Sequence, residues 1–165
     1  MNISESIGER GEAIFRVLMT RRHPTHGYLF EHPRFLGDKK RTIDFYVELF
    51  HPEALTPFFF AQVKSTSLGY TAKEHRLNIQ ISETTIKRLA AYPAPTYIIG
   101  IDESGETGYL LSANGEWQTG LASFPTIYPI NPDTLALLWK EVATYWQQTN
   151  FQSFKSAFSD PTWGQ

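Results

Sequence analysis

The chain of 165 residues contains no cysteine. This absence excludes disulfide bonds, thiolate metal sites and a cysteine nucleophile. Long apolar runs are also lacking, because no segment approaches the roughly 18 consecutive apolar residues that a membrane-spanning helix needs. The start of the chain is polar and acidic and does not resemble a secretory signal. We therefore expect a soluble, cytoplasmic protein with no membrane partner.

Apolar and aromatic residues are plentiful. Hydrophobic residues make up 41% of the chain and charged residues 19%, and there are 12 Phe, 8 Tyr and 4 Trp. This composition is typical of a globular protein with a sizeable core. The length fits one domain. We expect a single domain over residues 1–165, with its core at about residues 5–147 and a C-terminal tail at 148–165.

Charge is unevenly distributed, although the net charge is only -2. Residues 1–90 hold 13 Lys and Arg against 10 Asp and Glu, whereas residues 91–165 hold 2 against 7. Chance would also explain this asymmetry. If it is functional, an anionic partner would meet the first half of the chain. A homodimer that joins two basic halves is one assembly consistent with the pattern.

Three segments have the periodicity and capping residues of helices. Ser6 and Glu9 form a capping-box pattern that predicts a helix from Ser6 to about Arg21. Ser82 is expected to cap a short helix over 83–91. Asn131 and the proline after it predict the start of the last helix.

Other segments alternate between apolar and polar residues or are continuously apolar, as strands do. Ile43, Phe45, Val47 and Leu49 are predicted to face one side of a strand that forms a hairpin with the next strand. The predicted strands are 28–31, 43–50, 58–65, 76–81, 96–101 and 109–112. The order of helices and strands predicts an α/β or α+β domain with one central mixed sheet flanked by helices.

Four residues form a candidate catalytic constellation: Glu12, Asp44, Gln62 and Lys64. Gln62 and Lys64 are two residues apart, so they point to the same face of a strand. If the strands pair as a hairpin, Asp44 could approach both, and Glu12 would reach in from the first helix. Two carboxylates and an amide oxygen suit Mg²⁺ or Mn²⁺. Lys64 could lower the pKa of an attacking water or stabilise the charge of the transition state.

An acidic residue that opens one strand, followed by an acid-x-Lys motif on the next, is typical of the PD-(D/E)XK nuclease superfamily. This chain resembles that superfamily over about residues 5–112, with Asp44 as the first acid and Gln62-Val63-Lys64 as the second element. The resemblance implies a restriction-endonuclease-like core and metal-dependent hydrolysis of DNA phosphodiester bonds, in restriction, repair or phage defence. It also implies that Asp44, Glu12, Gln62 and the Val63 carbonyl hold Mg²⁺ or Mn²⁺.

Gln62 departs from the superfamily pattern because it replaces the second acid. Glutamine offers one oxygen but no charge, so it holds a divalent ion less tightly than a carboxylate. The resemblance extends to Mrr-type restriction enzymes, which also carry glutamine at this position. The departure makes Glu12 more necessary as a second anionic ligand. The alternative is a catalytically silent module on the same fold that binds nucleic acid or protein.

Several other side chains could contact DNA, or could be ordinary surface groups. They are Lys39, Lys40, Arg41, Ser65, Thr66, Lys73 and Arg76. A zinc site at His23, His26 and His32 is a weaker alternative to solvated loop histidines. Phe151, Phe154 and Phe158 recur at helical spacing, which favours packing of the tail on the core or a dimer contact.

Overall fold

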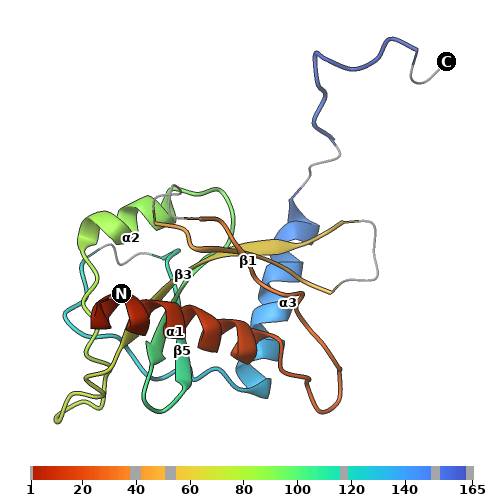
Figure 1. The fold of residues 1–165 in the computed structure, drawn as a ribbon. Helices are drawn as coiled ribbons and strands as arrows, with labels where there is room; N and C mark the ends of the chain where they lie inside the picture. Colours follow the sequence, from red (N-terminus) through yellow and green to blue (C-terminus); the bar gives the residue numbers. More distant parts are fainter. Residues whose placement is uncertain (1, 38–41, 51–54, 116–118, 150–152, 163–165) are drawn as a thin grey trace.

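The computed structural model describes residues 2–37, 42–50, 55–115, 119–149 and 153–162. Their fold is α+β, with a five-stranded mixed sheet in the order β1-β2-β3-β4-β5 (Figure 1). Strands β3 and β4 are parallel, and the other neighbours are antiparallel. In chain order the elements are α1 (Ile3–Met19), β1 (Arg34–Phe35), β2 (Phe45–Glu48), β3 (Phe58–Thr66), α2 (Glu83–Ala90), β4 (Thr96–Asp102), β5 (Thr107–Ser112) and α3 (Pro132–Gln148).

The centre of the sheet follows the predicted pattern. Strands β2 and β3 pair as the expected antiparallel hairpin, with Phe45 opposite Ala61 and Glu48 opposite Phe58. All seven residues of β4 are buried, as expected for a central strand covered on both faces. The crossover from β3 to β4 runs through α2, which begins after its predicted cap, Ser82.

Each face of the sheet carries its own apolar cluster. Helices α1 and α3 cover one face, where residues such as Phe15 and Leu138 pack with Phe59 and Tyr97. Helix α2 covers the other face, where Ile86 and Leu89 belong to one cluster with Ile98 and Phe124. The ends of β3 and β4 adjoin loops, and loops are where functional groups commonly collect.

The first helix begins earlier than predicted. Its N-cap is Asn2, whose side chain accepts a hydrogen bond from the Glu5 amide while Glu5 reaches back to the cap. The predicted start at Ser6 is therefore wrong. Both Asn2–Glu5 and Ser6–Glu9 match the capping-box pattern. The Asn2–Glu5 box forms because it adds a further turn of helical hydrogen bonds without loss of the later ones.

Two predicted strands are absent from the described residues. Segment 28–31 makes only a bridge between Phe30 and Leu49, and segment 76–81 makes only isolated bridges, among them Leu77 with Phe124. The alternation in 76–81 does correspond to burial, because Leu77, Ile79 and Ile81 all lie in the second cluster. Alternation thus identified a half-buried extended segment that has no neighbouring strand with which to form a ladder.

The C-terminal tail does not pack on the core. Phe154 is 67% exposed and Phe158 is 96% exposed, and segment 153–162 extends away from the sheet and helices (Figure 1). Phe151 lies outside the described residues. Of the two predicted possibilities, packing on the core is therefore wrong for Phe154 and Phe158, and a dimer contact stays a prediction. No helix of the described chain is long and apolar enough to cross a membrane.

Candidate functional site

The site begins at an irregularity in the β2–β3 hairpin. The Asp44 amide donates to the Ala61 carbonyl at 3.0 Å, although Phe45 is the residue that pairs with Ala61. Two residues of one strand thus oppose one residue of the other, which is the arrangement of a β-bulge. The bulge shifts the alternation, so Ile43 lies in the second cluster while Phe45 lies in the first. The prediction that both share one face is therefore wrong.

The bulge also directs the carboxylate of Asp44 toward β3. Asp44 Oδ2 accepts a hydrogen bond from the Val63 amide at 2.7 Å. The side chain therefore caps the hairpin ladder just before the first residue of β2. The N–H and C=O of one strand residue point to the same edge. The Val63 carbonyl therefore faces the same edge as Asp44, beyond the last β2–β3 pair. These are the two oxygen donors predicted for a metal ion at this point of the sheet.

Gln62 lies next to this capped edge and is only 6% exposed. Its side-chain oxygen Oε1 is buried and accepts no hydrogen bond within the described part of the chain. A buried polar atom without a partner costs about 1–3 kcal/mol, and most folds avoid that cost. The amide oxygen thus lowers stability and takes part in no hydrogen bond that the fold needs. This is the behaviour expected of an atom that binds a ligand.

Lys64 is exposed and makes no ion pair with any described residue. Its neighbours Val63 and Ser65 point toward α1, so Gln62 and Lys64 point to the other face of the sheet. The predicted shared face of Gln62 and Lys64 agrees with this alternation. The ammonium group remains available to an anion at the C-terminal end of β3.

Helix α1 is held close to the same part of β3. A Cβ atom added at Gly11 would lie 2.5 Å from the Cβ of Ser65, so only glycine allows this approach. The Ser65 hydroxyl donates to the Ile7 carbonyl at 3.0 Å. These contacts fix the half-buried Glu12, which follows Gly11, beside β3. Sequence analysis singled out Glu12 but missed Gly11.

Glu12 approaches from the α1 face of the sheet, whereas Gln62 lies on the opposite face. Within the described ranges, no three His, Asp or Glu side chains are grouped so that they could hold a metal ion. The predicted ligand set has two carboxylates, one amide and one backbone carbonyl, so it is not a group of that kind.

An open cleft of about 570 Å³ runs beside this edge. Residues from the first half of α1, including Ser4 and Gly8, form one wall, and β3 with the loop after it, from Val63 to Leu68, forms the other. Residues with hydroxyl groups, among them Ser4 and Ser67, therefore line the cleft, and Lys64 borders it although its side chain is directed to the other face of the sheet. Such donors suit the phosphate backbone of a nucleic acid.

The residues predicted to contact DNA differ from one another in exposure and in hydrogen bonding. Lys39, Lys40 and Arg41 lie outside the described residues. Thr66 is buried and accepts from the Leu68 amide, and the Arg76 guanidinium donates to Ser123 through two nitrogens, both at 2.8 Å. Lys73 is exposed. The hydrogen bonds of Ser65, Thr66 and Arg76 hold the fold together, so Lys64 and Lys73 are the more accessible cations.

Sequence analysis also missed Asp102, at the end of β4. It pairs with Thr66 of β3, is 7% exposed, and has a buried oxygen, Oδ1, with no hydrogen-bond partner in the described chain. The sequence does contain a signal for it, because an acidic residue directly follows the apolar run at 96–101.

The loop histidines were the alternative candidates for a zinc site. The His23 ring nitrogen Nδ1 accepts hydrogen bonds from the amides of Thr25 and His26, as in an ordinary loop.

Comparison with protein-family models, with curated proteins and with solved structures finds no match to this chain.

Proposed function

We propose that this protein is a metal-dependent DNA endonuclease that hydrolyses phosphodiester bonds, in restriction, repair or phage defence. One observation carries the proposal. The Asp44 carboxylate is fixed by the Val63 amide, and Gln62, the residue before Val63, has a buried oxygen that has no partner among the described residues. Fixed oxygen donors at the end of a hairpin are what a hard divalent cation requires.

The residues present fit Mg²⁺ or Mn²⁺. Asp44, Glu12, Gln62 and the Val63 carbonyl would supply oxygen ligands only, and this donor type favours these ions over zinc or copper. When bound, the ion would polarise the scissile phosphate and stabilise the charge that develops in hydrolysis. Because Gln62 contributes no charge, Glu12 and Asp44 would supply both negative ligands.

The protein's own side chains would perform the remaining steps. Lys64, exposed at the edge of the cleft, would orient the attacking water and offset negative charge on the phosphate. The cleft between α1 and the end of β3 would admit one DNA strand. Asp44 would keep its orientation through the Val63 amide, so it would need little reorganisation during the reaction.

The test is cleavage of supercoiled and branched DNA with Mg²⁺ or Mn²⁺. Asp44→Asn keeps an oxygen that can accept the Val63 hydrogen bond but removes the charge, and Lys64→Met keeps the length of the side chain without its ammonium group. We expect each variant to lose activity by at least about 100-fold. Lys87→Ala, which removes an exposed lysine paired with Glu83 on α2, should cleave like the wild type.

Two other outcomes would reject the proposal. Absence of cleavage, together with absence of Mn²⁺ binding in calorimetry, would favour the alternative of a catalytically silent module that binds nucleic acid or protein. Cleavage that survives both substitutions would place the activity elsewhere, in this chain or in a contaminant. Sedimentation of the protein with and without a DNA duplex would show whether it acts as the homodimer that the uneven charge suggests.

A further inference from the structure

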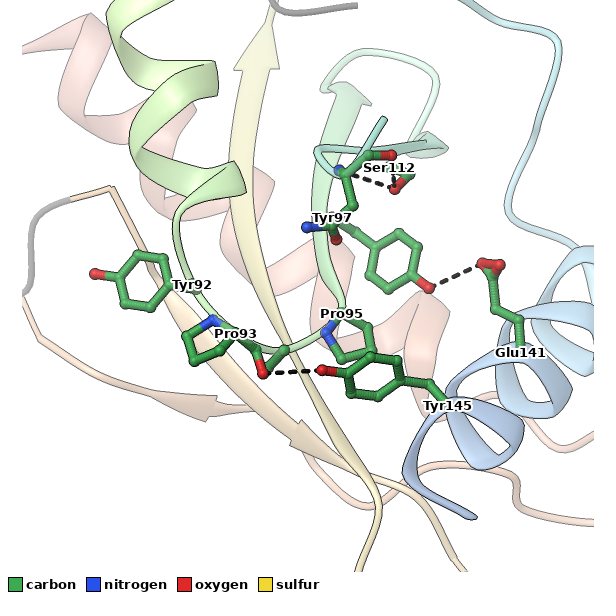
Figure 2. Close-up of a pocket in the computed structure, with 9 residues that line it drawn as sticks. Tyr92, Pro93, Pro95, Tyr97, Ser112, Glu141 and Tyr145 are labelled. Carbon is green, nitrogen blue, oxygen red and sulfur yellow. Dashed lines mark hydrogen bonds between the residues drawn. The ribbon is translucent and has the colours of Figure 1, made fainter. Parts of the chain in front are cut away.

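A second pocket lies at the opposite end of β4 from the candidate nuclease site. Its volume is about 400 Å³, and its walls come from the turn before β4, the end of β5 and the second half of α3. Figure 2 shows Tyr97 of β4 and Glu141 of α3 pointing toward one another, with Tyr145 beside Pro95. None of these residues belongs to the constellation around Asp44.

A buried hydroxyl holds Glu141, the only charged side chain among the described residues that line this pocket. The Tyr97 hydroxyl donates to Glu141 Oε1 at 2.8 Å, and Tyr97 is only 4% exposed. Burial raises the pKa of Tyr97 well above its usual value, and the nearby Glu141 raises it further. The proton therefore stays on the tyrosine, and its hydroxyl holds the Glu141 side chain in a fixed orientation.

An aromatic ring is fixed next to this carboxylate. The Tyr145 hydroxyl donates to the Pro93 carbonyl at 3.0 Å, which ties the ring across the mouth of the pocket (Figure 2). Tyr145 is 39% exposed, so part of its ring faces solvent. Tyr92 also borders the pocket, but its ring points away from Tyr97 and Glu141 (Figure 2). Aromatic faces attract cations because of their quadrupole.

The surrounding charge agrees with this preference. Among the residues that the structure describes, no lysine or arginine lines the pocket and none forms an ion pair with Glu141. Residues 91–165 hold 2 Lys and Arg against 7 Asp and Glu. A phosphate or carboxylate would meet repulsion here, whereas a cation would be attracted.

We propose that this pocket is a binding site for an organic cation, an ammonium or guanidinium group held by the Glu141 carboxylate against the Tyr145 ring. The group could belong to a free amine or to a lysine or arginine side chain of a partner protein. The chemistry is the same in both cases. The site is independent of the proposed nuclease activity and stands if that activity is absent.

A structural role for the same contact must be separated from binding. The Tyr97–Glu141 bond also connects α3 to the sheet, so deletion of either side chain would disturb the fold. Glu141→Gln avoids this problem, because the glutamine oxygen still accepts from Tyr97 while the charge is lost. Tyr145→Leu keeps an apolar side chain in place of the ring and removes the quadrupole.

The experiment is an NMR titration of the full chain with choline, with sodium chloride as the ionic-strength control. We expect saturable shifts of amides around Tyr97, Ser112 and Glu141. The neutral isostere 3,3-dimethyl-1-butanol should bind at least tenfold more weakly. Glu141→Gln should raise the Kd for choline at least tenfold, and Tyr145→Leu should raise it at least threefold.

The source of the cation is found by comparison of choline with the N-acetyl amides of arginine and lysine. Tighter binding of the amino-acid amides would indicate a partner protein, and tighter binding of choline would indicate a free amine. Equal affinity for choline and its neutral isostere would overturn the proposal. So would an unchanged Kd in Glu141→Gln, or shifts no larger than those that sodium chloride causes.

Discussion

The two ends of the paired strands β3 and β4 differ in how their buried polar groups are satisfied. At the N-terminal end, the Thr96 amide donates to Asn114 and its hydroxyl to the Ala94 carbonyl, and Trp146 donates to the Phe58 carbonyl. Farther along the strands, Gln62 in the middle of β3 and Asp102 at the C-terminal end of β4 each keep a buried oxygen without a partner among the described residues. One end is thus organised for stability, and the other retains polar atoms at a cost in stability, as functional sites do.

The largest effect expected from this comparison is at the N-terminal end of β3, where Phe59 lies in the apolar core. Phe59 is fully buried, and its ring contacts those of Phe30 and Tyr97. Phe59→Ala should lower the free energy of unfolding by about 3–5 kcal/mol through lost burial and a residual cavity. Urea unfolding followed by tryptophan fluorescence measures this loss. A loss below about 1 kcal/mol would contradict the assignment of this end as the stable part of the sheet.

The contact of α1 with β3 should give the next largest effect. Gly11→Ala would place a Cβ against Ser65, so we expect a loss of about 1–3 kcal/mol and a displaced helix. Gly8→Ala is the matched control on the same helix, since a Cβ there meets nothing within 4 Å. It should stabilise the protein by up to about 1 kcal/mol through helix propensity. Equal effects in urea unfolding would mean that the close approach is unimportant.

A pair of substitutions tests the comparison directly. Thr96→Val removes a satisfied hydroxyl and should cost about 1 kcal/mol. Gln62→Leu removes an unsatisfied amide, so it should leave stability unchanged or raise it by about 1 kcal/mol. Thermal unfolding of both variants provides the readout. If Gln62→Leu destabilises the protein more than Thr96→Val does, the Gln62 oxygen has a structural role that the fold does not reveal.

The smallest expected effect concerns alkaline pH. Burial raises the pKa of Tyr70, near the C-terminal end, to about 12 from its ordinary 10.0, and it also raises the pKa of Tyr97. The folded state therefore retains these protons when the unfolded chain loses them. The stabilisation is complete below pH 10 and is lost as the pH rises from 10 to 12.

The measurement is the free energy of unfolding in urea at several pH values between 9 and 12. We expect it to fall with pH above 10, and to fall less steeply in Tyr70→Phe and Tyr97→Phe. Tyr28→Phe, which alters a tyrosine that is 60% exposed, should follow the wild type. A slope that neither buried tyrosine affects would show that other groups control alkaline unfolding.

Sequence patterns predicted those helices and strands that are specified by their own residues, through caps or apolar runs. The cap at Ser82, the apolar run of β4 and the Asn131 start of α3 all correspond to the observed elements. Strand β1 was not predicted, because a two-residue edge strand depends on its neighbour β2 and has no pattern of its own. Segment 76–81 failed as a strand for a related reason, since burial does not guarantee a pairing partner.

The candidate site was predictable only in part. Asp44 and the Gln62-Val63-Lys64 motif stand out because polar residues interrupt apolar strands, and the hairpin does bring Asp44 to Val63. The contact between Gly11 and Ser65 was not predictable, because it depends on how a helix approaches a sheet. The Tyr97–Glu141 bond joins residues 44 positions apart and left no local pattern to detect.

The bulge at Asp44 decides which face of the sheet the preceding residue meets. If the ladder continued regularly through Asp44, Ile43 would share the face of Phe45 and turn from the second cluster toward the first. The carboxylate of Asp44 would turn to the opposite face at the same time. A substitution that made the ladder regular here would therefore damage the core as well as the site, which links the residue chosen at position 44 to the packing of the strand that carries it.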